Sequence, residues 1–121
     1  MIGYVTLGTN NLDRAVKFYD ALLGQIGAKR MMETDRNVAW STGTSGLGVC
    51  KPYDGKPATI GNGVMIALGV ENKAKVDALH QKAIELGGTD EGPPGPRGTS
   101  GFYAGYFRDL DGNKLSAFSM G

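Results

Sequence analysis

The apolar and polar positions of the first fifty residues predict one strand, one helix and three shorter strands. Residues 2–8 are rich in β-branched and aromatic side chains, which favour a strand. Apolar residues then recur at helical spacing, so we expect a helix that Asn10 or Asn11 caps and that Gly24 or Gly27 ends. Three short β-type segments follow, at about 28–33, 37–42 and 46–51.

The same order of elements recurs in the second half of the chain. Residues 63–70 predict a strand and residues 73–86 a helix with one apolar face. The proline-rich segment 90–98 is expected to be stiff and extended, because proline disfavours a helix interior. The remaining strands are predicted within 99–109 and at 114–119, joined by the turn Asp111-Gly112-Asn113.

The recurrence predicts two tandem βαβββ units in one α+β domain. An offset of 61 residues places Gly27 on Gly88 and the first helix on the second. We expect curved, antiparallel-rich sheets with the helices outside and a concave cleft for a small ligand. The domain would span 1–121, with unit 1 at about 1–51, a linker at about 52–62 and unit 2 at about 63–121.

Composition narrows the range of partners. Thirteen Lys and Arg face twelve Asp and Glu, and no basic run is present, so neither nucleic acid nor a membrane surface is expected as a partner. The longest apolar stretches are too short to span a bilayer. The single cysteine fits a reducing compartment, and we expect a cytoplasmic protein. Exposed sheet edges favour a homodimer.

Two segments carry a family resemblance. The N-terminal YVTLGTNNLDRAVKFYDALLG resembles the opening strand and helix of the vicinal oxygen chelate superfamily, and FRDLDGNKLSAF is similar to its C-terminal hairpin. That superfamily includes glyoxalase I, extradiol dioxygenases and bleomycin-resistance proteins, so the resemblance implies a fold but does not choose a reaction.

The resemblance also implies positions for a divalent metal. Catalytic members hold Zn, Ni, Fe or Mn with His and Glu side chains, which supply the nitrogen and anionic oxygen ligands that these metals prefer. Those positions fall on Tyr4, Met65, Ser116 and either Val49 or Cys50 in this chain. None of these is a standard ligand for such a metal, so we expect no metal cofactor.

The duplication predicts that Tyr4, Met65 and Ser116 converge in the cleft. They would either fill the space left by the metal or line a pocket for a ligand, with two hydroxyls and an adaptable apolar wall. Four aromatic side chains could add flat faces to such a pocket or pack in the core: Trp40, Tyr53, Phe102 and Tyr106.

Five further residues carry polar or reactive side chains. Arg97 could bind a carboxylate or phosphate, or be a solvated loop charge. Cys50 is expected to line the cleft or be buried rather than act as a nucleophile, because a nucleophilic thiol needs a base or cation beside it. His80, the only histidine, is expected to pack on the outer side of the sheet. The pair Arg108-Asp109 is expected to be structural.

Three functions remain open at this point. The first is a metal-independent small-molecule binder. The second is a glyoxalase-type lyase or isomerase, or a dioxygenase-like enzyme, with a non-standard metal site. The third is a non-catalytic dimer that serves a partner protein. The absent metal ligands favour the first.

Overall fold

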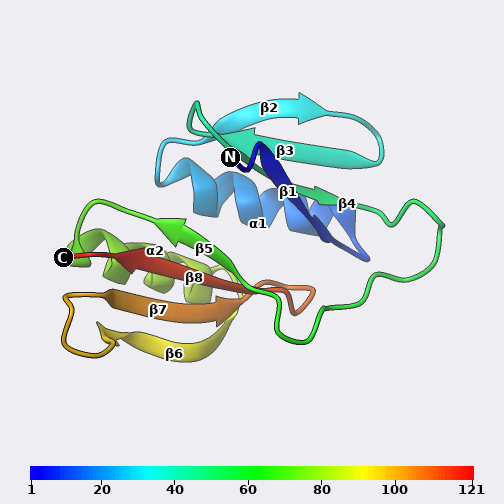
Figure 1. Ribbon diagram of the computed structural model, residues 1–121. Coiled ribbons are helices and arrows are strands. Elements are labelled where there is room, and N and C mark those ends of the chain that lie inside the picture. Colours follow the sequence, from blue (N-terminus) through cyan, green and yellow to red (C-terminus); the bar gives the residue numbers. More distant parts are fainter. The chain divides into compact units, whose positions relative to one another are not determined.

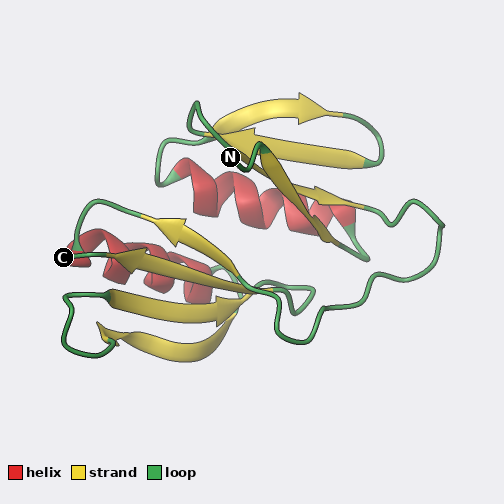
Figure 2. Ribbon diagram, viewed as in Figure 1, coloured by secondary structure: helices red, strands yellow, loops and turns green.

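The computed structural model describes residues 1–121 and divides into two compact units, Met1–Gly61 and Asn62–Gly121. Each unit consists of a strand, a helix and three more strands, and each helix lies along one face of its own sheet (Figures 1 and 2). The two predicted βαβββ units are therefore confirmed, and the units are described one at a time below.

The first unit is a mixed sheet with one helix. Its strands follow the order β1-β4-β3-β2, in which β1 is parallel to β4 and the other pairs are antiparallel. Two of its three strand pairs are antiparallel, so the prediction of an antiparallel-rich sheet is confirmed, while the parallel pairing of β1 with β4 was not predicted. The elements are β1 (Tyr4–Gly8), α1 (Leu12–Gly24), β2 (Lys29–Glu33), β3 (Asn37–Ser41) and β4 (Gly46–Cys50).

Local sequence sets both ends of α1. The side chain of Asn11 accepts a hydrogen bond from the backbone N–H of Arg14, which satisfies one of the free donors at the helix start. After the last helical residue the chain turns through Gly27 at a φ of 84°, a conformation that glycine adopts without a Cβ clash. The buried face of α1 comprises Ala15, Phe18, Tyr19, Leu22 and Leu23.

The second unit repeats this topology. Its strand order is β5-β8-β7-β6, and β5 is again parallel to β8. The proline-rich segment forms the edge strand β6, which pairs with β7 through two irregularities in register. Proline is tolerated there because an edge strand leaves one row of N–H groups without a ladder partner. The elements are β5 (Ile66–Gly69), α2 (Lys73–Glu85), β6 (Thr89–Pro96), β7 (Tyr103–Arg108) and β8 (Lys114–Ser119).

His80 anchors α2 to its sheet. Its Nε2 lies 3.1 Å from Asp90 Oδ1 and 3.1 Å from the carbonyl oxygen of Tyr106, and its ring meets Phe107 edge to face. The expectation that His80 packs on the helix side of the sheet is confirmed.

Neither α2 nor α1 is long and apolar enough to cross a membrane.

The hairpin between β7 and β8 is held by Asp109. One carboxylate oxygen accepts hydrogen bonds from the backbone N–H groups of Asp111 and Asn113, and the other accepts from the Asn113 side chain. Arg108 donates to Glu91 and to the carbonyl oxygen of Gly112. The structural role expected for Arg108-Asp109 agrees with these contacts.

Candidate ligand-binding face

The register of the second sheet separates two faces. Phe107 and Leu115 are opposite each other in the β7–β8 ladder, are fully buried, and lie on the side that α2 covers. Because successive side chains of a strand point to opposite faces, the next pair, Tyr106 and Ser116, lies on the other side. We call this side the helix-free face of the second sheet.

Ser116 is the most buried polar side chain on this face. The residue is 2% exposed, and its hydroxyl makes no hydrogen bond within the chain. No fully buried side-chain oxygen of the protein lacks a partner, so the small exposed part of Ser116 includes its Oγ. The hydroxyl is therefore available to a ligand that reaches the face beside Tyr106.

Two cations lie over the ring of Tyr106. The guanidinium carbon of Arg97 is 5.3 Å from the ring centroid, and Lys114 Nζ is 5.5 Å from it. Arg97 also donates to the carbonyl oxygens of Pro93 and Pro96, at 2.7 and 3.3 Å. The arginine is thus held against the sheet at a fixed place instead of extending into solvent.

An aromatic pair continues the same face. Phe118 follows Ser116 by two residues, and its ring stacks on Phe102 with centroids 5.6 Å apart. A Cβ at Gly69, the ladder partner of Phe118, would lie 3.2 Å from that ring, so the glycine leaves room for it. Met65 directly precedes β5, and exposure alternates from Met65 to Gly69, which places Met65 on the helix-free side too.

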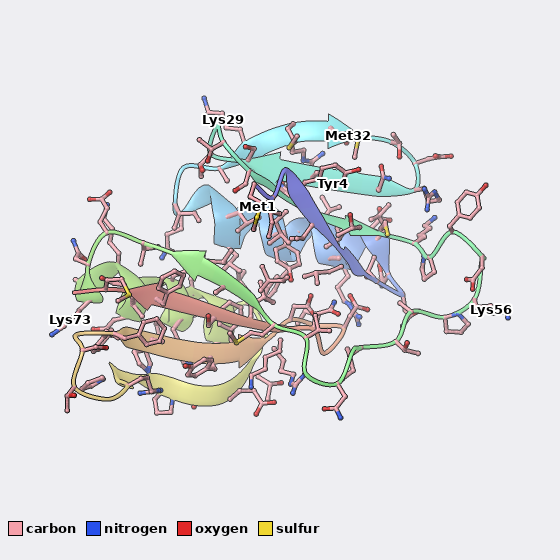
Figure 3. The ribbon with its side chains drawn as sticks, viewed as in Figure 1. Met1, Tyr4, Lys29, Met32, Lys56 and Lys73 are labelled. Atoms are coloured by element: carbon pink, nitrogen blue, oxygen red, sulfur yellow. The ribbon has the colours of Figure 1, made fainter.

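The first sheet also has a helix-free face. Tyr4 and Gly46 are ladder partners on it, and the Met31 thioether lies over Gly46, where a Cβ would come within 2.8 Å of the sulfur. Tyr4 is 65% exposed, and Figure 3 shows it on β1 with Met32 on β2 of the same unit. Cys50 belongs to this face as well, because it alternates with the fully buried Val49.

Two of the aromatic candidates lie elsewhere. Trp40 is 2% exposed and lies on the side that α1 covers, where its ring meets Tyr19 and its Nε1 donates to Asp20. It is a core residue and does not belong to the helix-free face. Tyr53 is 90% exposed in the segment after β4, beneath the guanidinium of Arg36.

The ring of Trp40 faces α1 because successive side chains of β3 point alternately to the two faces of the sheet. Val38 and Trp40 point toward α1, and Ala39 between them points to the opposite face.

The predicted convergence of Tyr4 with Met65 and Ser116 relates residues of two units and stays a prediction.

Two side chains on the helix sides of the sheets, Asp20 and Tyr103, have shifted pKa values. The Arg30 guanidinium beside Asp20 holds the pKa of that carboxyl below its usual range. The hydrogen bond from the Tyr103 phenol to Asp77 raises the pKa of Tyr103. Both shifts follow from structural contacts rather than from a reactive site.

The side chains at the four family positions do not fit a divalent metal. A phenol, a thioether, a hydroxyl and either a thiol or an isopropyl group replace the expected imidazoles and carboxylates. Nowhere in the structure do three His, Cys, Asp or Glu side chains form a group that could hold a metal ion. No step of a reaction can therefore be assigned to a metal at these positions.

The fold and this face define a class of duplicated βαβββ proteins, and comparison with known proteins gives the family. Residues 1–116 match the model of the Glyoxalase/Bleomycin resistance protein/Dioxygenase superfamily. The chain therefore belongs to that superfamily. A search of curated proteins found no match.

Solved structures agree with this assignment. A glyoxalase/bleomycin resistance protein from Albidiferax ferrireducens T118 is 37% identical, with a TM-score of 0.91 and 98% of each chain covered. A hypothetical protein from S. aureus is 27% identical, with a TM-score of 0.76 and coverage of 98% of this chain and 92% of that one. A lactoylglutathione lyase from Agrobacterium tumefaciens, 22% identical at a TM-score of 0.73 and with the same coverage, shares the fold.

Sequence reasoning missed two side chains of the helix-free face, Lys114 and Phe118. The signal was present in the strand KLSAFS, because alternation places both on the same side as Ser116. The contact of Arg97 with Tyr106 had no such signal, since the two residues are nine positions apart and an irregular loop lies between them.

Proposed function

We propose that this protein binds a small organic molecule on the helix-free face of its second sheet, without the divalent metal that the family resemblance implies. One observation carries the proposal. At the position where the resemblance expects a metal-binding carboxylate, Ser116 offers a nearly buried hydroxyl that has no partner within the chain. Because its Oγ lies on the small exposed part of the residue, a ligand that reaches this face can be its hydrogen-bond partner.

The rest of the face supports binding chemistry more than metal chemistry. Tyr106 lies opposite Ser116 in the ladder and carries a second hydroxyl, and Phe102 and Phe118 offer aromatic surface nearby. Apolar surface with a few convergent polar groups is typical of small-molecule sites. The homodimer and the cytoplasmic location expected from the sequence stay predictions.

The alternative is a glyoxalase-type lyase or isomerase with a non-standard metal site, which membership of the superfamily favours. Elemental analysis of protein purified without chelator separates the two. We expect substoichiometric Zn, Ni, Fe and Mn. Stoichiometric metal that is lost in Ser116→Ala or Tyr4→Phe would overturn the metal-free proposal.

Ligand binding itself is tested by a thermal-shift screen with aromatic, peptide-like and α-keto compounds. We expect at least one class to raise the melting temperature, and Ser116→Ala to reduce that increase. Ser100→Ala, which changes an exposed serine in the loop before β7, is the matched control and should leave it unchanged. If no class stabilises the protein, or if both variants respond like the wild type, the proposal fails.

A further inference from the structure

The positive charge on the helix-free face of the second sheet is not balanced by carboxylates. Arg97, Arg108 and Lys114 carry three positive charges, and Glu91, which pairs with Arg108, carries one negative charge, so the excess is two. Arg108 and Lys114 are direct partners in the β7–β8 ladder, where like charges repel. Neither Arg97 nor Lys114 forms a salt bridge.

Arg97, which pairs with no carboxylate, is held in place by other contacts of the second unit. Backbone carbonyl oxygens of Pro93 and Pro96 hold two of the guanidinium's nitrogens. A Cβ at Gly95 would lie 3.0 Å from Nη1, and one at Gly92 would lie 3.6 Å from Nη2. The two glycines therefore provide the space in which the guanidinium lies over Tyr106.

We propose that Arg97 and Lys114 bind an anionic group, a carboxylate or a phosphate, of the small molecule. This inference rests on the proposed function and adds the chemical class of its ligand. A guanidinium has five N–H donors, of which the two carbonyl contacts use two, so donors remain for an anion. Because Arg97 is already fixed, little of its side-chain entropy remains to be lost on binding.

The neighbouring groups complete such a site. Lys114 and Ser116 are two residues apart on β8 and so share its helix-free side, where the Ser116 hydroxyl can donate to an anionic oxygen. Phe118 lies two residues beyond Ser116 on β8, and its ring stacks on Phe102, which directly precedes β7; this pair suits a flat apolar body. The ligand class is therefore a small aromatic or apolar anion.

The test is a titration of the ¹⁵N-labelled protein, followed by NMR, with phenyl phosphate, benzoate and the neutral benzamide. We expect the two anions to produce saturable shifts at the amides of Arg97, Tyr106 and Ser116. Benzamide should bind at least about tenfold more weakly, since it lacks the charge-assisted hydrogen bonds.

Arg97→Gln and Lys114→Gln should each weaken the binding of both anions at least about tenfold. The chain offers matched controls. Arg36 lies 5.3 Å over Tyr53 and also donates to a backbone carbonyl, and Lys73 lies 5.7 Å over Tyr103. Arg36→Gln and Lys73→Gln should leave anion binding unchanged.

The outcomes separate this inference from the proposed function. If benzamide binds the same amides as tightly as benzoate, or if the Arg97 and Lys114 variants bind the anions like the wild type, the anion inference is overturned while small-molecule binding stands. If none of the three probes shifts these amides, and the thermal-shift screen also finds no ligand, both are overturned.

Discussion

The indole Nε1 of Trp40 donates a hydrogen bond of 2.8 Å to Oδ1 of Asp20, and thereby joins the middle of β3 to α1. The same carboxylate accepts two hydrogen bonds from Arg30 of β2, at 2.6 and 3.0 Å. One helical aspartate thus connects two strands of the first sheet. A tryptophan that sequence reasoning treated as a ligand candidate is instead part of the core of its unit.

Trp40→Phe should destabilise the protein by about 1–3 kcal/mol, because it removes the hydrogen bond to Asp20 and leaves space in a buried site. Urea denaturation measures the change in the free energy of unfolding. Tyr53→Phe, which alters a 90% exposed aromatic residue, is the control and should be close to neutral. Equal stability of the two variants would contradict the core role of Trp40.

The ion pair of Asp20 and Arg30 should make stability depend on acidic pH. Arg30 lowers the pKa of Asp20 in the folded state below the value of about 3.9 expected when the chain is unfolded. The stabilisation is therefore complete above the unfolded pKa and is lost as the pH falls through the folded one. It should not exceed about 1 kcal/mol, since the pair is partly exposed to solvent.

The measurement compares wild type with Asp20→Asn by urea denaturation at pH 7 and at pH 3. The stability difference between the two proteins should be smaller at pH 3, because this pH lies below the unfolded pKa of the carboxyl and the stabilisation is lost as the pH falls from there. Asp35→Asn, in the exposed turn after β2, should show no such change. A difference that is constant across this range would show that the ion pair contributes nothing.

His80 should carry its hydrogen on Nε2 when it is neutral. Both atoms near Nε2, Asp90 Oδ1 and the Tyr106 carbonyl oxygen, accept hydrogen bonds, so the nitrogen between them must donate. Long-range ¹H–¹⁵N NMR spectra of the neutral imidazole distinguish the two tautomers. A spectrum of the Nδ1–H form would contradict the geometry that anchors α2.

Two glycine-to-alanine substitutions should change the stability of the protein in opposite directions. A Cβ at Gly105 would lie 3.0 Å from His80 Cδ2 and 3.0 Å from Pro94 Cγ, so Gly105→Ala should cost about 1–3 kcal/mol. Gly24 ends α1, and a Cβ there would meet no atom outside the helix within 4 Å, so Gly24→Ala should stabilise by about 0.5–1 kcal/mol. Thermal unfolding of both variants tests the pair, and a gain for Gly105→Ala would show that α2 packs more loosely than described.

Local signals in the sequence predicted most element boundaries. The strand at 114–119 has the expected limits, and α1 begins after Asn11, one of the two caps foreseen. Caps, turn glycines and alternation act over a few residues, so they can be identified without knowing the partners of a strand. The first strand of each unit is shorter than expected, because pairing with β4 or β8 sets where it begins.

The sequence by itself determined the duplicated order of elements, the superfamily and the absence of standard metal ligands at the family's positions. Only the tertiary structure decided that β1 and β5 pair in parallel, that Trp40 faces α1 while Ser116 faces away from α2, and that Arg97 and Lys114 share the ring of Tyr106. The physical reason is that alternation defines two faces of a strand but not which of them a helix covers. That choice, and contacts between residues distant along the chain, depend on strand register and packing.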